Sequence, residues 1–116
     1  MKRAAILIGV SRTGGLPALV GPVDSVSSLA AWARSQQFQS VAAITDADGP
    51  VTVARIKEVL HPLVAAKNLD QLLLYFCGHG LNVQREERWL LSNAPSDPDE
   101  AVNSYAAASL ASASRP

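Results

Sequence analysis

The stretch Leu72-Leu73-Leu74-Tyr75-Phe76-Cys77-Gly78-His79-Gly80 decides the fold class of this chain. Six consecutive apolar residues without a charge are typical of a parallel strand that is buried on both faces. Such a strand ends at the carboxyl edge of its sheet, where α/β proteins place their sites. The sequence therefore predicts that a histidine flanked by two glycines lies at this edge.

Two apolar runs and two helical patterns precede this strand. The first run predicts a strand over residues 4–10 with an exit loop from Ser11 to Gly21, and a helix follows from an N-cap at Asp24 to about Gln37. The second run predicts a strand over Ser40–Thr45 that is closed by a turn at residues 46–49. The second helix is expected to have Pro50 in its first turn. Pro62 interrupts the second helical pattern, so we expect a kink or an early end near His61. The third strand covers about Gln71 to Cys77.

This order of elements, β-α-β-α-β, predicts an α/β fold with a mainly parallel sheet covered by helices, because such crossovers are almost always right-handed. After Gly80, residues 81–83 and 88–91 are expected to pair as a small hairpin. Residues 93–100 are rich in turn formers and predict an irregular loop. We expect one domain over residues 1–103 and a poorly ordered tail of alanine and serine over residues 104–116.

Length and composition restrict the class of protein. The 116 residues suffice for one domain, and ten basic residues balance ten acidic ones without a basic stripe, which argues against nucleic acid as a partner. No apolar run approaches the roughly 20 residues of a membrane helix, so no membrane partner is expected. A single cysteine is typical of a reducing compartment, and we expect a cytoplasmic protein that needs neither a cofactor nor a metal.

The segment Gly78-His79-Gly80 suggests acyl-transfer chemistry. A histidine beyond a buried strand can act as a general base, and flanking glycines let the backbone approach a ligand closely. The N–H of Gly80 could then help to stabilise an oxyanion. The structural alternative is a histidine that merely occupies a tight turn.

A family resemblance rests on residues 4–10, Ala30-Ala31-Trp32-Ala33, Gln37-Phe38, Ile44-Thr45-Asp46 and, above all, residues 74–80. Together they resemble the large-subunit half of caspase-like cysteine peptidases, closest to the bacterial caspase-like and metacaspase branch, over about residues 3–92. The resemblance implies a three-layer caspase-like fold and hydrolysis of peptide or protein substrates by a Cys–His dyad. It implies further that His79 is the catalytic base and that Gly80 supplies an oxyanion-hole amide.

The nucleophile of this family is missing from the expected place. The resemblance places it after a further strand, within Asp-x-Cys, and in caspases ~50 residues beyond the histidine; no cysteine follows His79 here. We therefore expect an amino-terminal portion without the C-terminal strands, inactive alone, and truncation, frameshift and loss of catalysis all remain open. Cys77 could approach His79 if the strand continued through Gly78, but a buried packing role is favoured.

Substrate preference and two other functions stay open. By the resemblance, Arg12 could bind an acidic side chain and Asp24 a basic one. A non-catalytic interaction or regulatory module is the main alternative, with a protein partner or a second copy at an unpaired sheet edge. Nucleotide binding by residues 9–15 is disfavoured, because their spacing matches neither phosphate-loop pattern and Pro17 and Pro22 delay the helix.

Overall fold

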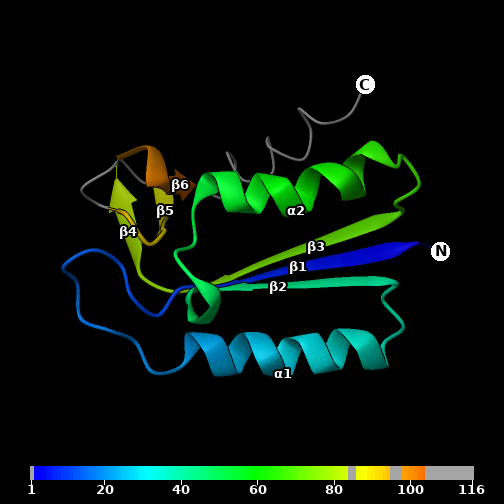
Figure 1. Ribbon diagram of the computed structural model, residues 1–116, viewed down its shortest axis with the longest axis horizontal. Coiled ribbons are helices and arrows are strands. Elements are labelled where there is room, and N and C mark those ends of the chain that lie inside the picture. The colour runs from blue at the N-terminus through cyan, green and yellow to red at the C-terminus, as the bar shows by residue number, and fades with distance from the viewer. Residues whose placement is uncertain (1, 84–85, 95–97, 104–116) are drawn as a thin grey trace.

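A computed structural model describes residues 2–83, 86–94 and 98–103, and its centre is a parallel sheet of three strands with the order β2-β1-β3 (Figure 1). The elements of this part are β1 (Arg3–Gly9), α1 (Pro22–Ser35), β2 (Ser40–Thr45), η1 (Asp46–Asp48), α2 (Val53–Ala65) and β3 (Gln71–Cys77). The predicted β-α-β-α-β order and α/β class are confirmed. The second and third strands have the predicted bounds.

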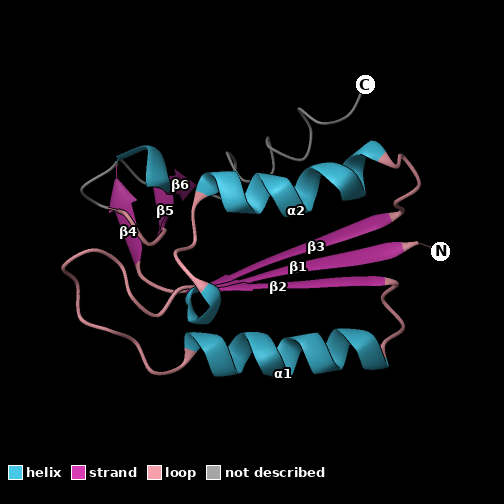
Figure 2. Ribbon diagram, viewed as in Figure 1, coloured by secondary structure: helices cyan, strands magenta, loops and turns pink. Residues whose placement is uncertain are grey.

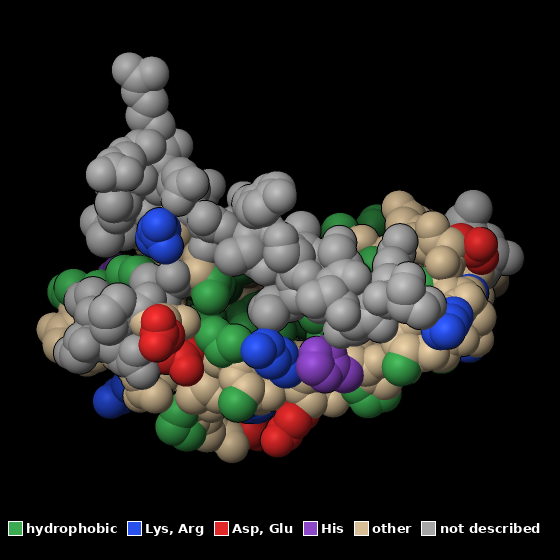
Figure 3. All heavy atoms as spheres, turned by 90° about the horizontal axis from the view of Figure 1, so that it is seen from above, with side chains coloured by type: hydrophobic (Ala, Val, Ile, Leu, Met, Phe, Trp, Pro, Cys, Tyr) green, Lys and Arg blue, Asp and Glu red, His purple; other side chains and the backbone are tan. Residues whose placement is uncertain are grey.

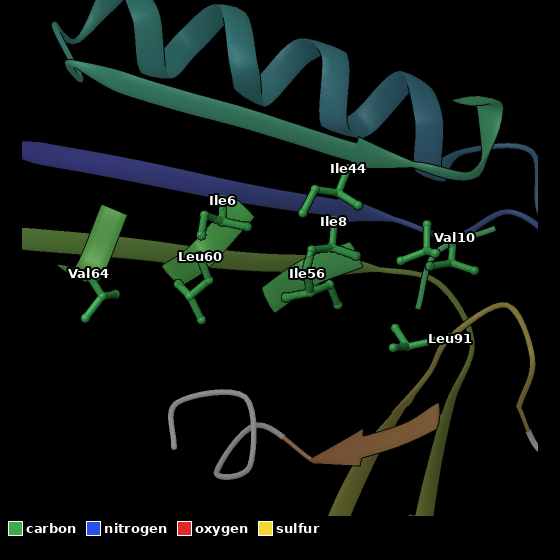
Figure 4. Close-up of a cluster of buried hydrophobic side chains, with 9 residues drawn as sticks. Ile6, Ile8, Val10, Ile44, Ile56, Leu60, Val64 and Leu91 are labelled. Atoms are coloured by element: carbon green, nitrogen blue, oxygen red, sulfur yellow. The ribbon is translucent and has the colours of Figure 1, made fainter. Parts of the chain in front are cut away.

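The sheet lies between two helices, with α1 on one face and α2 on the other (Figure 2). This arrangement follows from β1, whose side chains alternate between the faces. Ala5 and Leu7 pack toward α1, whereas Ile6 and Ile8 pack toward α2. Figure 4 shows the larger cluster, on the α2 side, made of Ile6, Ile8, Val10, Ile44, Val51, Ile56, Leu60, Val64 and Leu91.

Helix α1 begins earlier than predicted. Its N-cap is Gly21, whose carbonyl oxygen accepts from Ser25 N at 2.9 Å, so the assignment of Asp24 as the cap is wrong. Pro22 occupies the first turn, where the missing N–H of proline costs nothing. Asp24 lies instead in the first turn, at the end of the helix where a negative charge is favourable.

Helix α2 differs from the prediction at both ends. It begins after Thr52, whose side-chain oxygen accepts from Arg55 N at 3.2 Å, so Pro50 lies outside the helix. The early end near His61 is also wrong, because the helix includes Pro62 and continues to Ala65. Burial of Val64 against the core offsets the hydrogen bond that proline removes from the last turn.

A second, antiparallel sheet follows the first, with the strands β4 (Gly80–Val83), β5 (Glu86–Leu90) and β6 (Ala101–Asn103) in the order β4-β5-β6. The predicted hairpin is confirmed as β4 and β5, whereas β6 and the 3₁₀ turn η2 (Pro98–Glu100) were not predicted. Residues 104–116, expected to be a poorly ordered tail, lie outside the described residues. Leu91 and the stacked rings of Phe76 and Trp89, 5.0 Å apart, join this sheet to the main core.

The face of the molecule on the α2 side carries charges of both signs. In Figure 3, which views the molecule from the α2 side, basic and acidic side chains are interspersed among hydrophobic ones. This distribution agrees with the formal net charge of zero. Within the part of the chain that the structure describes, no helix is both long and apolar enough to span a bilayer.

Candidate functional site

The carboxyl ends of β1, β2 and β3 share one edge of the sheet, because all three strands are parallel. Three segments leave the sheet there: residues 11–21, which we call the β1–α1 loop, Asp46 after β2, and the turn Gly78–Gly80 after β3. Figure 1 shows the β1–α1 loop and the second sheet beyond this edge. The histidine predicted for this edge is therefore where the sequence placed it.

His79 is half-buried and is oriented by a backbone carbonyl. Its Nε2 lies 2.7 Å from the carbonyl oxygen of Pro17 in the β1–α1 loop. A carbonyl oxygen can only accept a hydrogen bond, so Nε2 is the donor and carries the hydrogen. In the neutral ring, Nδ1 then keeps its lone pair, which is the state that a general base requires.

The two glycines beside His79 have different roles. A Cβ atom on Gly78 would lie 2.8 Å from Cζ of Phe76 and 3.0 Å from the carbonyl oxygen of Val10, so only glycine fits there without displacement. Gly80 is exposed and pairs with Trp89 of β5. Because Leu90 N donates to the carbonyl oxygen of His79 at 3.0 Å, this pair is not hydrogen-bonded and the Gly80 N–H points away from β5.

The first half of the β1–α1 loop is held by Asp46. One carboxylate oxygen of Asp46 accepts from the backbone N–H groups of Ser11, at 2.9 Å, and Arg12, at 2.8 Å. The loop also closes on itself, since Leu19 N donates to the carbonyl oxygen of Ser11 at 2.8 Å. The position of the Pro17 carbonyl is thus fixed from both ends of the loop.

The second sheet holds the middle of the same loop. Thr13 is fully buried, and its hydroxyl donates to the carbonyl oxygen of Leu90 at 3.3 Å. Gly14 N donates to the carbonyl oxygen of Ser92 at 3.0 Å, and Ser92 Oγ in turn accepts from Val51 N at 2.8 Å. The loop, the His79 turn and the second sheet therefore form one hydrogen-bonded unit.

Cys77 belongs to the α1 face of the sheet rather than to the His79 turn. The strand ends at Cys77 and a bend follows at Gly78, so the continued strand that would align Cys77 with His79 is not formed. Cys77 instead lies beside Tyr75, two residues earlier on the same face. Partial burial raises the pKa of the Tyr75 phenol, as does its hydrogen bond to Cys77, and a hydrogen bond with Ser25 opposes this shift.

The two residues predicted for a substrate pocket lie at opposite ends of the β1–α1 loop. Arg12 is exposed near its beginning, and Asp24 is exposed in the first turn of α1. The residue that contacts His79 is Pro17, whose position in the sequence predicted only a delay to the helix. Asp46 was assigned to a turn, although its position directly after a strand was the signal for a carboxylate at this edge.

The segment from Gly9 to Gly15 does not lead directly into a helix. Residues 16–21 separate Gly15 from α1, so the helix N-terminus does not follow the glycines as in phosphate-binding loops. Gly9 is instead required for packing, since a Cβ there would lie 2.8 Å from the carbonyl oxygen of Pro22. Among the residues that the structure describes, no three His, Cys, Asp or Glu side chains gather as a metal site.

Comparison with known proteins adds no assignment to this geometry. No family model matches the sequence, and no curated protein matches it. The groups that bear on function are therefore His79, its carbonyl partner and the amide of Gly80.

Proposed function

We propose that this chain supplies the general-base half of a cysteine peptidase of the caspase-like type, which hydrolyses peptide bonds in peptide or protein substrates. The observation that carries the proposal is the 2.7 Å contact between His79 Nε2 and the Pro17 carbonyl oxygen, which leaves Nδ1 as the basic nitrogen at the carboxyl edge of the sheet. The resemblance of residues 74–80 to the caspase-like family supports the same assignment.

In this proposal His79 moves protons and Gly80 stabilises charge. A thiolate attacks the carbonyl carbon of the scissile bond, and the carbonyl oxygen becomes an oxyanion. His79 holds the proton taken from the thiol and returns it to the leaving amine. The Gly80 N–H, which points away from β5, is suited to donate to the oxyanion.

The nucleophile is not Cys77 in this proposal. Cys77 is the only cysteine in the sequence, and it packs beside Tyr75 on the α1 face, before the bend that leads to His79. The proposal therefore places the thiolate on a cysteine that the same gene encodes downstream of Asn103. A peptide electrophile should accordingly label Cys77 in the folded chain no faster than in the denatured chain.

The test begins with the source gene, translated in all three frames for at least ~50 codons after the codon for Asn103. A hydrophobic strand ending in Asp-x-Cys supports the proposal, and its absence from every frame contradicts it. The encoded longer protein would then be treated with a peptidyl acyloxymethyl ketone. We expect labelling to fall by about 100-fold or more in His79→Ala and to stay unchanged in His61→Ala, the exposed histidine of α2.

A second candidate function is a non-catalytic interaction module, and the composition of β3 favours it. β3 is an edge strand in the described sheet, yet residues 72–77 carry no charge and are half-buried, without the charges or prolines that protect edge strands. A second copy could pair with this edge. Sedimentation velocity should then show a dimer that persists in His79→Ala and in Ala43→Lys on β2, the opposite edge, but not in Leu73→Lys, with circular dichroism to verify that each variant folds.

A further inference from the structure

Large hydrophobic side chains are exposed on the β1–α1 loop. Leu16 is 38% exposed and Val20 is 95% exposed, and only Trp32 joins them among the exposed large hydrophobic residues that the structure describes. Pro17 and Ala18, which lie between them, are exposed as well. Apolar side chains left in water contribute nothing to folding, and a group of them at the surface is typical of a binding site.

This exposed apolar segment, residues 16–20, is held in place rather than loose. Leu16 N donates to the carbonyl oxygen of Thr13 at 3.0 Å, and Leu19 N donates to that of Ser11 at 2.8 Å. The buried Thr13 side chain fastens the base of the segment to the second sheet. A surface that is ordered before binding loses little conformational entropy when a ligand arrives.

The segment lies directly beside the candidate base and carries no charge. Pro17, at its centre, is the residue whose carbonyl oxygen contacts His79. All residues from 13 to 23 are uncharged, and the charged Arg12 and Asp24 lie outside this stretch. A ligand placed on the segment therefore meets apolar surface, where a charged side chain would lose hydration without gaining an ion pair.

We infer that residues 16–20 form a subsite for a bulky apolar side chain of a peptide or protein substrate, next to the bond that His79 acts on. The inference rests on the proposed function, because it names the substrate class of that peptidase. It assigns Leu16 and Val20 as specificity-determining residues. It also makes the charged Arg12 and Asp24 secondary in substrate choice.

The test measures binding to the 116-residue chain and needs no turnover. Three fluorescein-labelled peptides would differ only in a central pair of residues, which are two leucines, two aspartates or two lysines, and fluorescence anisotropy would give each Kd. We expect the leucine peptide to bind at least about tenfold more tightly than the others, which corresponds to about 1.4 kcal/mol. Val20→Lys should abolish this preference.

The matched control is Ala31→Lys, which adds the same charge at an exposed position of α1 and should leave the preference unchanged. Equal affinity for the three peptides, a preference for a charged peptide, or a leucine preference that survives Val20→Lys overturns the inference. Self-association or vesicle binding that depends on Val20, without peptide selectivity, overturns it too. Failure of the peptidase proposal appears separately, in the labelling of the longer protein.

Discussion

Replacing Gly9 by alanine should destabilise the fold through a clash between β1 and α1. A Cβ on Gly9 would lie 2.8 Å from the carbonyl oxygen of Pro22 and 2.8 Å from Cγ2 of Val26. Cγ2 of Val26 moves only if this buried side chain changes its χ1 rotamer, which a helix restricts for valine. The Pro22 oxygen belongs to the backbone of the first turn of α1 and moves only with the helix. The substitution therefore requires α1 to shift away from the end of β1.

The size of this effect follows from two opposing terms. Overpacking of this kind costs about 3 kcal/mol at its upper end, and the lower backbone entropy of the unfolded alanine variant returns about 0.4–1 kcal/mol. We expect Gly9→Ala to lower the free energy of unfolding by about 2 kcal/mol. Gly15→Ala has no atom within 4 Å of its Cβ position and no positive φ, so it should raise the same quantity by about 0.4–1 kcal/mol.

Urea unfolding followed by tryptophan fluorescence and circular dichroism measures both variants against the wild type. The two should differ by about 3 kcal/mol with equal m-values, since neither change alters the surface exposed on unfolding. A difference below about 1 kcal/mol would refute the packing argument for Gly9. The pair of variants also distinguishes a packing role of Gly9 from the phosphate-loop interpretation, which assigns Gly9 and Gly15 alike to ligand binding.

Three further predictions concern other parts of the fold. Leu91→Ala should lower the free energy of unfolding by about 2–5 kcal/mol in urea titrations, because this fully buried side chain joins the second sheet to the main core. Glu100→Gln should cost about 1 kcal/mol in thermal melts, since a Glu100 carboxylate oxygen accepts from Val53 N at the start of α2, and Glu58→Gln on the exposed side of the same helix should cost much less. Because the pKa of Tyr75 is higher in the folded than in the unfolded chain, the stability that Tyr75 contributes is present below the unfolded pKa and is lost as the pH rises through the folded pKa. Between about pH 8 and 11, the urea midpoint should therefore fall more in the wild type than in Tyr75→Phe.

The elements that could be predicted from sequence are those that local patterns determine. The runs before Gly9 and Gly78 marked the strands, and the period of α2 marked a helix. The start of α1 was misassigned because Asp24 is the stronger capping residue by type, although Pro22 had already fixed the first turn. Strand β6 has only three residues and forms by pairing with β5, so no local sequence pattern predicts it.

The sequence predicted the histidine of the candidate site but not the groups that surround it. His79 follows a strand, and the strand's pattern places it at the edge of the sheet. Its partner is a backbone carbonyl oxygen 62 positions earlier in the chain. Every residue carries such a group, so the type of residue at position 17 gives no signal. The same holds for the carbonyl oxygens of Leu90 and Ser92 that position the β1–α1 loop.

The contact of His79 with Pro17 is compatible with a structural role as well as with a catalytic one, and the energies separate the two. As a hydrogen bond at a half-buried position, it contributes about 0.5–1.5 kcal/mol to folding. As the contact that orients a general base, it serves a group worth about 10²–10⁴ in rate, or about 2.7–5.4 kcal/mol of activation free energy. If His79 only stabilises the turn, its replacement should lower the free energy of unfolding by about 1 kcal/mol and leave activity otherwise unchanged. A histidine kept as the base, when replaced, loses far more activity than its stability cost can explain.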